Sequence, residues 1–78
     1  MITSGQIKAA RALLGLTAVN LAELSGVGFT TIVRLESADG VPRGNIKTFD
    51  AVQKALEHAG IEFIGTPEDG AGVRFKQR

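Results

Sequence analysis

The chain has 78 residues, no cysteine and a formal net charge of +1 at pH 7, so we expect one domain with a small core and no disulfides or thiolate metal sites. Its hydrophobic content of 44% is too high for a disordered chain. No apolar run approaches the roughly 18 residues that span a membrane, and the N-terminus lacks a secretory pattern, which predicts a cytoplasmic protein without a membrane partner.

Two short helices are predicted in the first third of the chain. Thr3 or Ser4 can begin the first one, because a side-chain oxygen there accepts a hydrogen bond from a free backbone N–H, and Gly15 ends it. The second helix runs from Ala18 to Ser25 after a cap at Thr17. Both carry apolar residues at helical spacing, which indicates that each buries one face.

A glycine turn joins the second helix to a third. Gly26 stops the second helix, because glycine accepts the left-handed conformation that a sharp turn needs. The third helix is predicted from about Gly28 to Ser37, with Ile32 and Leu35 three positions apart on one face. Two helices joined by a glycine-containing turn are typical of a helix-turn-helix, whose second helix can enter the major groove of DNA.

The fourth predicted helix follows a loop over residues 38–45. Asn45 or Thr48 can cap it, and Gly60 stops it. Its apolar residues recur at three- and four-residue steps, which predicts one buried face. The residues expected to face the core are Phe49, Val52 and Leu56.

The chain changes character after Gly60. Ile61–Ile64 and Val73–Lys76 are short β-prone runs, and residues 65–72 between them have the composition of a loop. We therefore expect a β-hairpin with a long and mobile connection. Because an isolated hairpin is marginal in water, this one must pack on the helices, pair with another chain, or do both.

The order of these elements resembles the Xre-type family of small DNA-binding domains, which is related to the lambdoid phage repressors and Cro. The residues that carry the resemblance lie between about Gln6 and Phe49; they are Leu21-Ala22, Ser25-Gly26-Val27, Ile32 and Leu35-Glu36. The join Ala59-Gly60-Ile61-Glu62-Phe63 is similar to small bacterial members that end in a strand pair.

The fold that this resemblance implies is mainly α. It is a four-helix, lambda-repressor-like helix-turn-helix domain followed by a small β-hairpin, with residues 1–78 in a single domain. Residues 1–59 are expected to be helical, and residues 60–78 to form the hairpin. The partner that the resemblance implies is double-stranded DNA, and the implied function is sequence-specific transcription regulation.

The exposed face of helix 28–37 reads bases in the family. Arg34 is the strongest candidate here, because a guanidinium can pair bidentately with guanine. Phe29 and Val33 either touch thymine methyl groups or form an apolar contact within protein, and both interpretations stay open. The residues assigned to DNA binding are Thr17, Gly28, Phe29, Thr30, Thr31, Val33, Arg34, Arg43 and Lys47.

Two further assignments follow from the positions that family members use. Arg43 and Lys47 come after the third helix, where members touch phosphates, although a solvated loop with ordinary surface charges is the alternative. Arg11 and Glu36 match an arginine–glutamate pair of the related repressors. We favour a structural ion pair for them over direct phosphate binding by Arg11.

A homodimer is expected through the hairpin. Exposed strand edges pair readily unless they are protected, so two hairpins can extend one sheet across a two-fold axis. Arg74 and Lys76 offer the alternative of edge-protecting charges on a monomer. The residues assigned to dimerisation are Ile61, Phe63, Ile64, Val73 and Phe75.

Other functions have weaker support. The alternative to DNA binding is a protein-interaction module or antitoxin-like adaptor, because Ala18 stands where most family members carry a glutamine that grips the DNA backbone. An enzyme is not expected, since His58 is the only histidine and the acidic residues form no catalytic set. The sequence indicates no cofactor, metal or small-molecule ligand.

Overall fold

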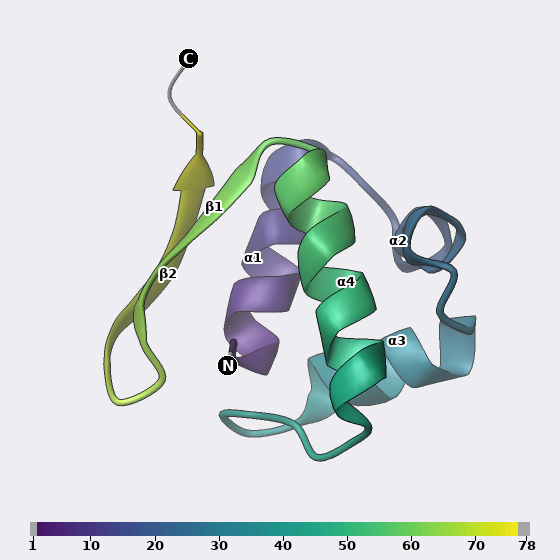
Figure 1. Ribbon diagram of the computed structural model, residues 1–78, viewed down its shortest axis with the longest axis horizontal. Coiled ribbons are helices and arrows are strands. Elements are labelled where there is room, and N and C mark those ends of the chain that lie inside the picture. Colours follow the sequence, from purple (N-terminus) through teal and green to yellow (C-terminus); the bar gives the residue numbers. More distant parts are fainter. Residues whose placement is uncertain (1, 77–78) are drawn as a thin grey trace.

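The computed structural model describes residues 2–76, in which four helices precede a two-stranded antiparallel sheet (Figure 1). The helices are α1 (Ser4–Leu14), α2 (Ala18–Ser25), α3 (Phe29–Ser37) and α4 (Ile46–His58). The strands are β1 (Ile61–Thr66) and β2 (Asp69–Phe75). The prediction of a mainly α chain that ends in a β-hairpin is confirmed.

Polar side chains and glycines set the ends of the helices. Thr3 and Thr17 each accept a hydrogen bond from a backbone N–H in the first turn and have their own N–H bonded in return, which makes two capping boxes. Asn45 begins α4 by accepting one backbone N–H. Gly15 and Gly26 end α1 and α2 in the left-handed conformation, so the direction of the chain changes where glycine permits it.

One apolar core joins the helices and the start of the hairpin. Each of the helices and β1 contributes at least one side chain to it. The buried apolar residues are Ile2, Ile7, Ala10, Leu21, Ile32, Leu35, Phe49, Val52, Leu56 and Ile61. The predicted inward face of α4 is confirmed. Among residues 2–76, no helix is both long enough and apolar enough to cross a membrane.

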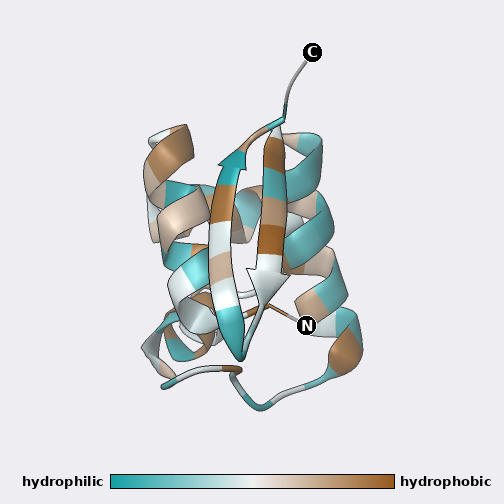
Figure 2. Cartoon of the chain, turned by 90° about the vertical axis from the view of Figure 1, so that its left-hand side faces the viewer, coloured by the Kyte–Doolittle hydropathy of each residue, from teal (hydrophilic) through white to brown (hydrophobic). Residues whose placement is uncertain are grey.

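The hairpin lies across the outer side of α1 and α4 (Figure 2). β2 packs against α1, and β1 packs against α4. Ile61 pairs with Phe75 and Phe63 pairs with Val73, so these four side chains share the sheet face that turns toward the helices. The opposite face carries the ion pair of Glu62 and Arg74, with Ile64 beside it.

The prediction of a long connection within the hairpin is wrong. Both strands continue to a turn of two residues, Pro67 and Glu68. Gly65 makes this possible, because a Cβ added to it would lie 2.1 Å from the carbonyl oxygen of Gly70 across the hairpin. The Thr66 hydroxyl accepts the N–H of the residue after the turn at 3.0 Å, which closes it. Glycine-rich composition here permits close strand approach rather than a loop.

The beginning of α1 is bonded to three other parts of the chain. The Ser4 hydroxyl is buried and donates to the carbonyl of Leu35 in α3, and the Ser4 N–H donates to the Gly40 carbonyl at 2.9 Å. The Gln6 amide nitrogen donates to the carbonyls of Ile64, at 3.1 Å, and Gly72, at 2.9 Å. The first turn of α1 therefore holds α3, the following loop and the hairpin together.

Candidate nucleic-acid interface

α3 has one face in the core and one in solvent. Ile32 and Leu35 are fully buried beneath it. Phe29 and Val33 lie four residues apart, and their exposed fractions are 50% and 43%. Gly28 is the N-cap residue of α3, so no side chain caps the backbone N–H groups of the first turn. α3 thus packs on the core through its apolar face. Its opposite face, the open side of α3, is exposed to solvent.

Glu36 is turned away from this open side. Arg11 of α1 donates from Nε to Glu36 Oε2 at 2.9 Å and from Nη2 to Oε1 at 2.8 Å, while its Nη1 donates to the Leu16 carbonyl at 3.0 Å. The hydrogen bonds to Glu36 raise the pKa of Arg11, so the guanidinium keeps its positive charge. The expected ion pair is present, and the single acidic residue of α3 is neutralised on its inner side.

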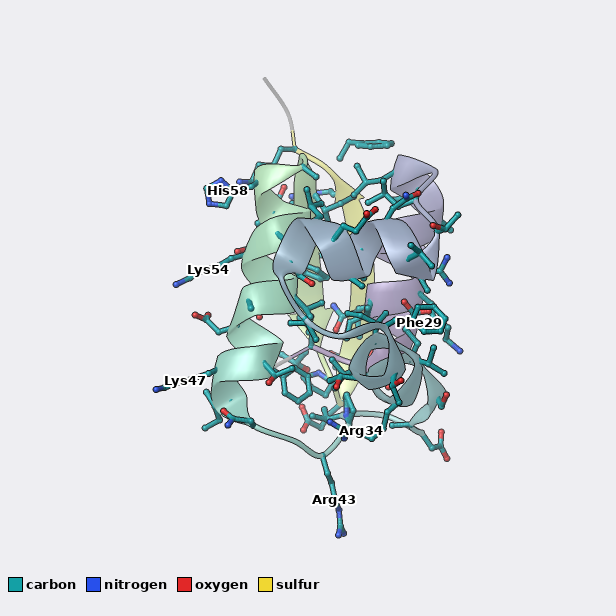
Figure 3. All side chains as sticks on the ribbon, turned by 90° about the vertical axis from the view of Figure 1, so that its right-hand side faces the viewer. Phe29, Arg34, Arg43, Lys47, Lys54 and His58 are labelled. Atoms are coloured by element: carbon teal, nitrogen blue, oxygen red, sulfur yellow. The ribbon has the colours of Figure 1, made fainter. Side chains whose placement is uncertain are left out.

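The open side of α3 and the neighbouring loop carry cations. Arg34 on α3, Arg43 in the loop and Lys47 on α4 are exposed, and none of them forms an ion pair within residues 2–76. In Figure 3, Arg43 points away from the body of the protein below Arg34, and Lys47 lies at the start of α4. By contrast, Lys54 further along α4 is paired with Asp50 at 3.0 Å.

The threonines assigned to the interface differ in their surroundings. The Thr17 hydroxyl accepts the N–H of Asn20 at 3.0 Å, so it caps α2 while remaining exposed. Thr30 is exposed on α3, whereas Thr31 is half-buried. The N-terminus of α2, with its free backbone N–H groups, and Thr30 are the polar groups that this part of the surface offers to a ligand.

Arg34 is oriented differently from the sequence-based expectation. Its Nη1 donates to the Arg43 carbonyl at 2.6 Å, and the guanidinium lies against the backbone of Gly44. Arg34 therefore contacts the loop between α3 and α4 instead of extending freely from the helix.

The hairpin residues assigned to dimerisation do not form one exposed patch. Ile61 is fully buried in the core, so it could join a strand pairing through its backbone but not through its side chain. A residue that follows a helix-ending glycine is well placed to pack back on that helix, which explains its burial. Phe63, Ile64 and Val73 are half-buried, whereas Phe75 is 53% exposed.

Sequence reasoning missed the tertiary role of Gln6. The Thr-x-x-Gln pattern from Thr3 to Gln6 signals a capping box, and the Gln6 Oε1 does accept the Thr3 N–H at 2.8 Å. Nothing in that local pattern indicates that the amide nitrogen reaches the hairpin. That contact depends on the hairpin lying on α1, which brings together residues 58 and 66 positions apart.

No group of three or more metal-ligating side chains is brought together in residues 2–76. No protein-family model matches the chain, and no curated protein matches it. The function is therefore inferred from the contacts and charges described above.

Proposed function

We propose that the chain is a sequence-specific DNA-binding transcription regulator in which α2 and α3 form a helix-turn-helix of the Xre type, with α3 in the major groove. The observation that carries the proposal is the charge on the open side of α3. That side holds no acidic residue, because Glu36 is paired inward, and Arg34, Arg43 and Lys47 surround it without acidic partners among residues 2–76.

Phosphates are the first ligands in this proposal. Arg43 extends into solvent from the loop, and Lys47 lies in the first turn of α4, where free backbone N–H groups also favour an anion. Thr17 supports a third backbone contact at the start of α2. These contacts fix the orientation of the protein on the duplex, and base contacts then supply the specificity.

Base contacts come from the exposed residues of α3. Thr30 has a hydroxyl that can donate to or accept from a base edge, and the half-buried Thr31 lies at the rim. Phe29 and Val33 are apolar and exposed, which suits contact with thymine methyl groups. The proposal therefore predicts a preference for sites that contain thymine.

The hairpin offers free strand edges for a homodimer. The Lys76 N–H donates to the Gly60 carbonyl at 2.8 Å, which makes the pair Ile61 and Phe75 a non-hydrogen-bonded one. In such a pair the backbone N–H and C=O groups point away from the neighbouring strand. Every second residue along each strand thus presents backbone donors and acceptors to a second copy of the chain.

A homodimer would place two α3 helices on one DNA site. For half-sites one helical turn apart, their separation is about 34 Å, and the operator is palindromic. Sedimentation velocity of the full chain at micromolar concentration tests the dimer. A dimer supports the proposal, whereas a clean monomer indicates that Arg74 and Lys76 protect the edge instead.

Fluorescence anisotropy with duplex DNA tests the central proposal. The logarithm of the association constant should fall linearly with the logarithm of the salt concentration, with a slope of about −0.9 per neutralised phosphate. Arg43→Ala and Lys47→Ala should each make the slope shallower by about 0.9. Lys54→Ala, which removes a cation already paired with Asp50, is the matched control and should leave the slope unchanged. No binding at low salt contradicts DNA binding.

A protein-interaction module is the second candidate, and one observation favours it. Phe29 and Val33 form an apolar pair on the open side of α3, where a protein partner could bury both. Selection from a random duplex library separates the two functions. Enrichment of a defined sequence supports the DNA regulator, and enrichment of none, together with a flat salt dependence, supports the module.

A further inference from the structure

The loop between α3 and α4 is held by few contacts. Among the described residues, the backbone of residues 41–44 makes no hydrogen bond to another backbone group. Val41 packs against the core and Pro42 is buried, which anchors the first half of the loop. The second half, which carries Arg43 and Gly44, is exposed.

The Arg34 side chain is bound to this second half. Its Nη1 donates to the Arg43 carbonyl at 2.6 Å. A Cβ added to Gly44 would lie 3.3 Å from Arg34 Nη2 and 3.6 Å from Nη1, so the guanidinium rests against the Gly44 backbone. The contact joins the open side of α3 to the loop that leads into α4.

This placement conflicts with base reading by Arg34. Bidentate pairing with guanine uses two parallel N–H groups along one edge of the guanidinium. Here Nη1 is engaged with the Arg43 carbonyl, and Nη2 lies beside Gly44. Reading a base would require Arg34 to release the loop that presents Arg43.

We infer that Arg34 is a positioning residue that holds the loop over residues 43–44, so that Arg43 and the first turn of α4 face the same stretch of DNA backbone. That Arg34 holds the loop is inferred from its contacts alone. That the loop faces DNA rests on the proposed function. Sequence preference then comes from the other exposed residues of α3, and Arg34 contributes equally on every sequence.

The first experiment measures the loop without DNA. Backbone ¹⁵N order parameters of residues 41–45 should fall in Arg34→Ala, from about 0.85 toward about 0.6, while those of α1 and α4 stay unchanged. Arg34→Lys should keep part of the order that Arg34→Ala loses. Its ammonium group can donate to the Arg43 carbonyl, but it lacks the planar guanidinium that lies against Gly44.

A second variant keeps both arginine charges. Gly44→Ala sets a methyl group 3.3 Å from Arg34 Nη2, and the φ of +159° at Gly44 also strains an alanine there, so this variant should loosen the same residues although no charge is lost. Because the backbone strain acts without Arg34, the variant serves as the reference for a loosened loop, and Arg34→Ala decides the inference. Unchanged order of residues 41–45 in Arg34→Ala overturns it.

The second experiment compares two duplexes, one selected for tight binding and one random. Arg34→Ala should weaken both by the same factor, about tenfold, and leave the order of preference among sequences unchanged. Arg34→Lys should recover part of the affinity on both. A loss confined to the selected duplex, with relaxed preference at one base pair, overturns the inference in favour of base reading.

The two experiments keep the two proposals apart. A loop that loses order in Arg34→Ala supports the positioning role even if no duplex binds, in which case only the DNA function fails. Duplex binding with an undisturbed loop preserves the DNA function and removes the positioning role.

Discussion

α3 and the hairpin are both attached to α1, but the contacts that attach them differ in kind. α3 buries two apolar side chains completely and receives a bidentate ion pair from Arg11 to Glu36. The hairpin buries Ile61 completely and receives two neutral hydrogen bonds from the single amide of Gln6. α1 thus holds α3 with a charged contact in addition to the neutral bond from Ser4, whereas its hydrogen bonds to the hairpin are neutral.

This difference in contacts predicts which region should unfold locally first. Charge-assisted bidentate hydrogen bonds are stronger than neutral ones, and breaking a buried pair leaves a charge without compensation. Neutral hydrogen bonds to carbonyls that already have a ladder partner lose less when they break. We therefore expect the hairpin to open locally while α3 unfolds only with the whole domain.

The largest effect is expected for Glu36→Gln, which keeps the shape of the side chain but leaves the Arg11 charge uncompensated. The free energy of unfolding should fall by about 3 kcal/mol, near the lower end for a broken buried pair, because Arg11 is 26% exposed. Urea denaturation followed by circular dichroism measures it. Glu23→Gln, at an exposed glutamate of α2, is the matched control and should change stability by less than about 0.5 kcal/mol. Equal losses of stability in Glu36→Gln and Glu23→Gln would contradict a special contribution of the ion pair to holding α3.

The second effect concerns Gln6→Glu, which keeps an acceptor for the Thr3 N–H but turns a carboxylate toward two carbonyl oxygens. The free energy of unfolding at pH 7 should fall by about 2 kcal/mol, because the buried amide nitrogen, which donates two hydrogen bonds, is replaced by an oxygen that can only accept. Hydrogen exchange should show the loss first at the amides of β1 and β2. If the amides of α3 accelerate equally, the hairpin is not a separate unit.

A matched pair of smaller substitutions separates local from global opening. Ile32→Val and Ile61→Val each remove one methylene from a fully buried side chain and should each cost about 1 kcal/mol in global unfolding. If the hairpin opens by itself, Ile61→Val should accelerate exchange of the hairpin amides about fivefold, because 1.4 kcal/mol corresponds to tenfold. Ile32→Val should leave them unchanged. The opposite pattern contradicts local opening.

The smallest effect is expected at the exposed pair of Glu62 and Arg74, which bridges β1 and β2 at 3.0 Å. Hydrogen bonding from Arg74 lowers the pKa of Glu62, so this contribution is present above the unfolded value of about 4.3 and is lost as pH falls through the folded one. Titration of the Glu62 carboxyl by NMR should give a pKa below the ordinary value. In Arg74→Ala it should return toward that value, with thermal stability at pH 7 unchanged within error.

Local chemistry was sufficient to predict the helical part of the fold. Thr3, Thr17, Gly15 and Gly26 act within one turn of the chain, so their roles can be read from the residues beside them. The apolar spacing of α4 likewise predicts its buried face, because helical geometry fixes which residues share a side. These signals need no knowledge of distant contacts.

The remaining features depend on residues far apart in the sequence. The glycines of the hairpin have the composition of a loop, and only the folded hairpin brings Gly65 against the backbone of Gly70. The sequence predicts that Arg34 extends from α3, but the carbonyl of Arg43 gives its guanidinium a partner nine residues away. Long polar side chains choose partners by proximity in the fold, which composition does not reveal.

The reach of Gln6 has a consequence for synthesis on the ribosome. Its two carbonyl partners lie 58 and 66 residues further along, so they leave the exit tunnel long after α1 itself. Until then, the nascent helical part carries a polar amide on a surface that the hairpin later covers, and water must satisfy it. Translation therefore completes the domain in a fixed order, and arrest before residue 61 should give a helical intermediate that is more sensitive to protease than the released chain.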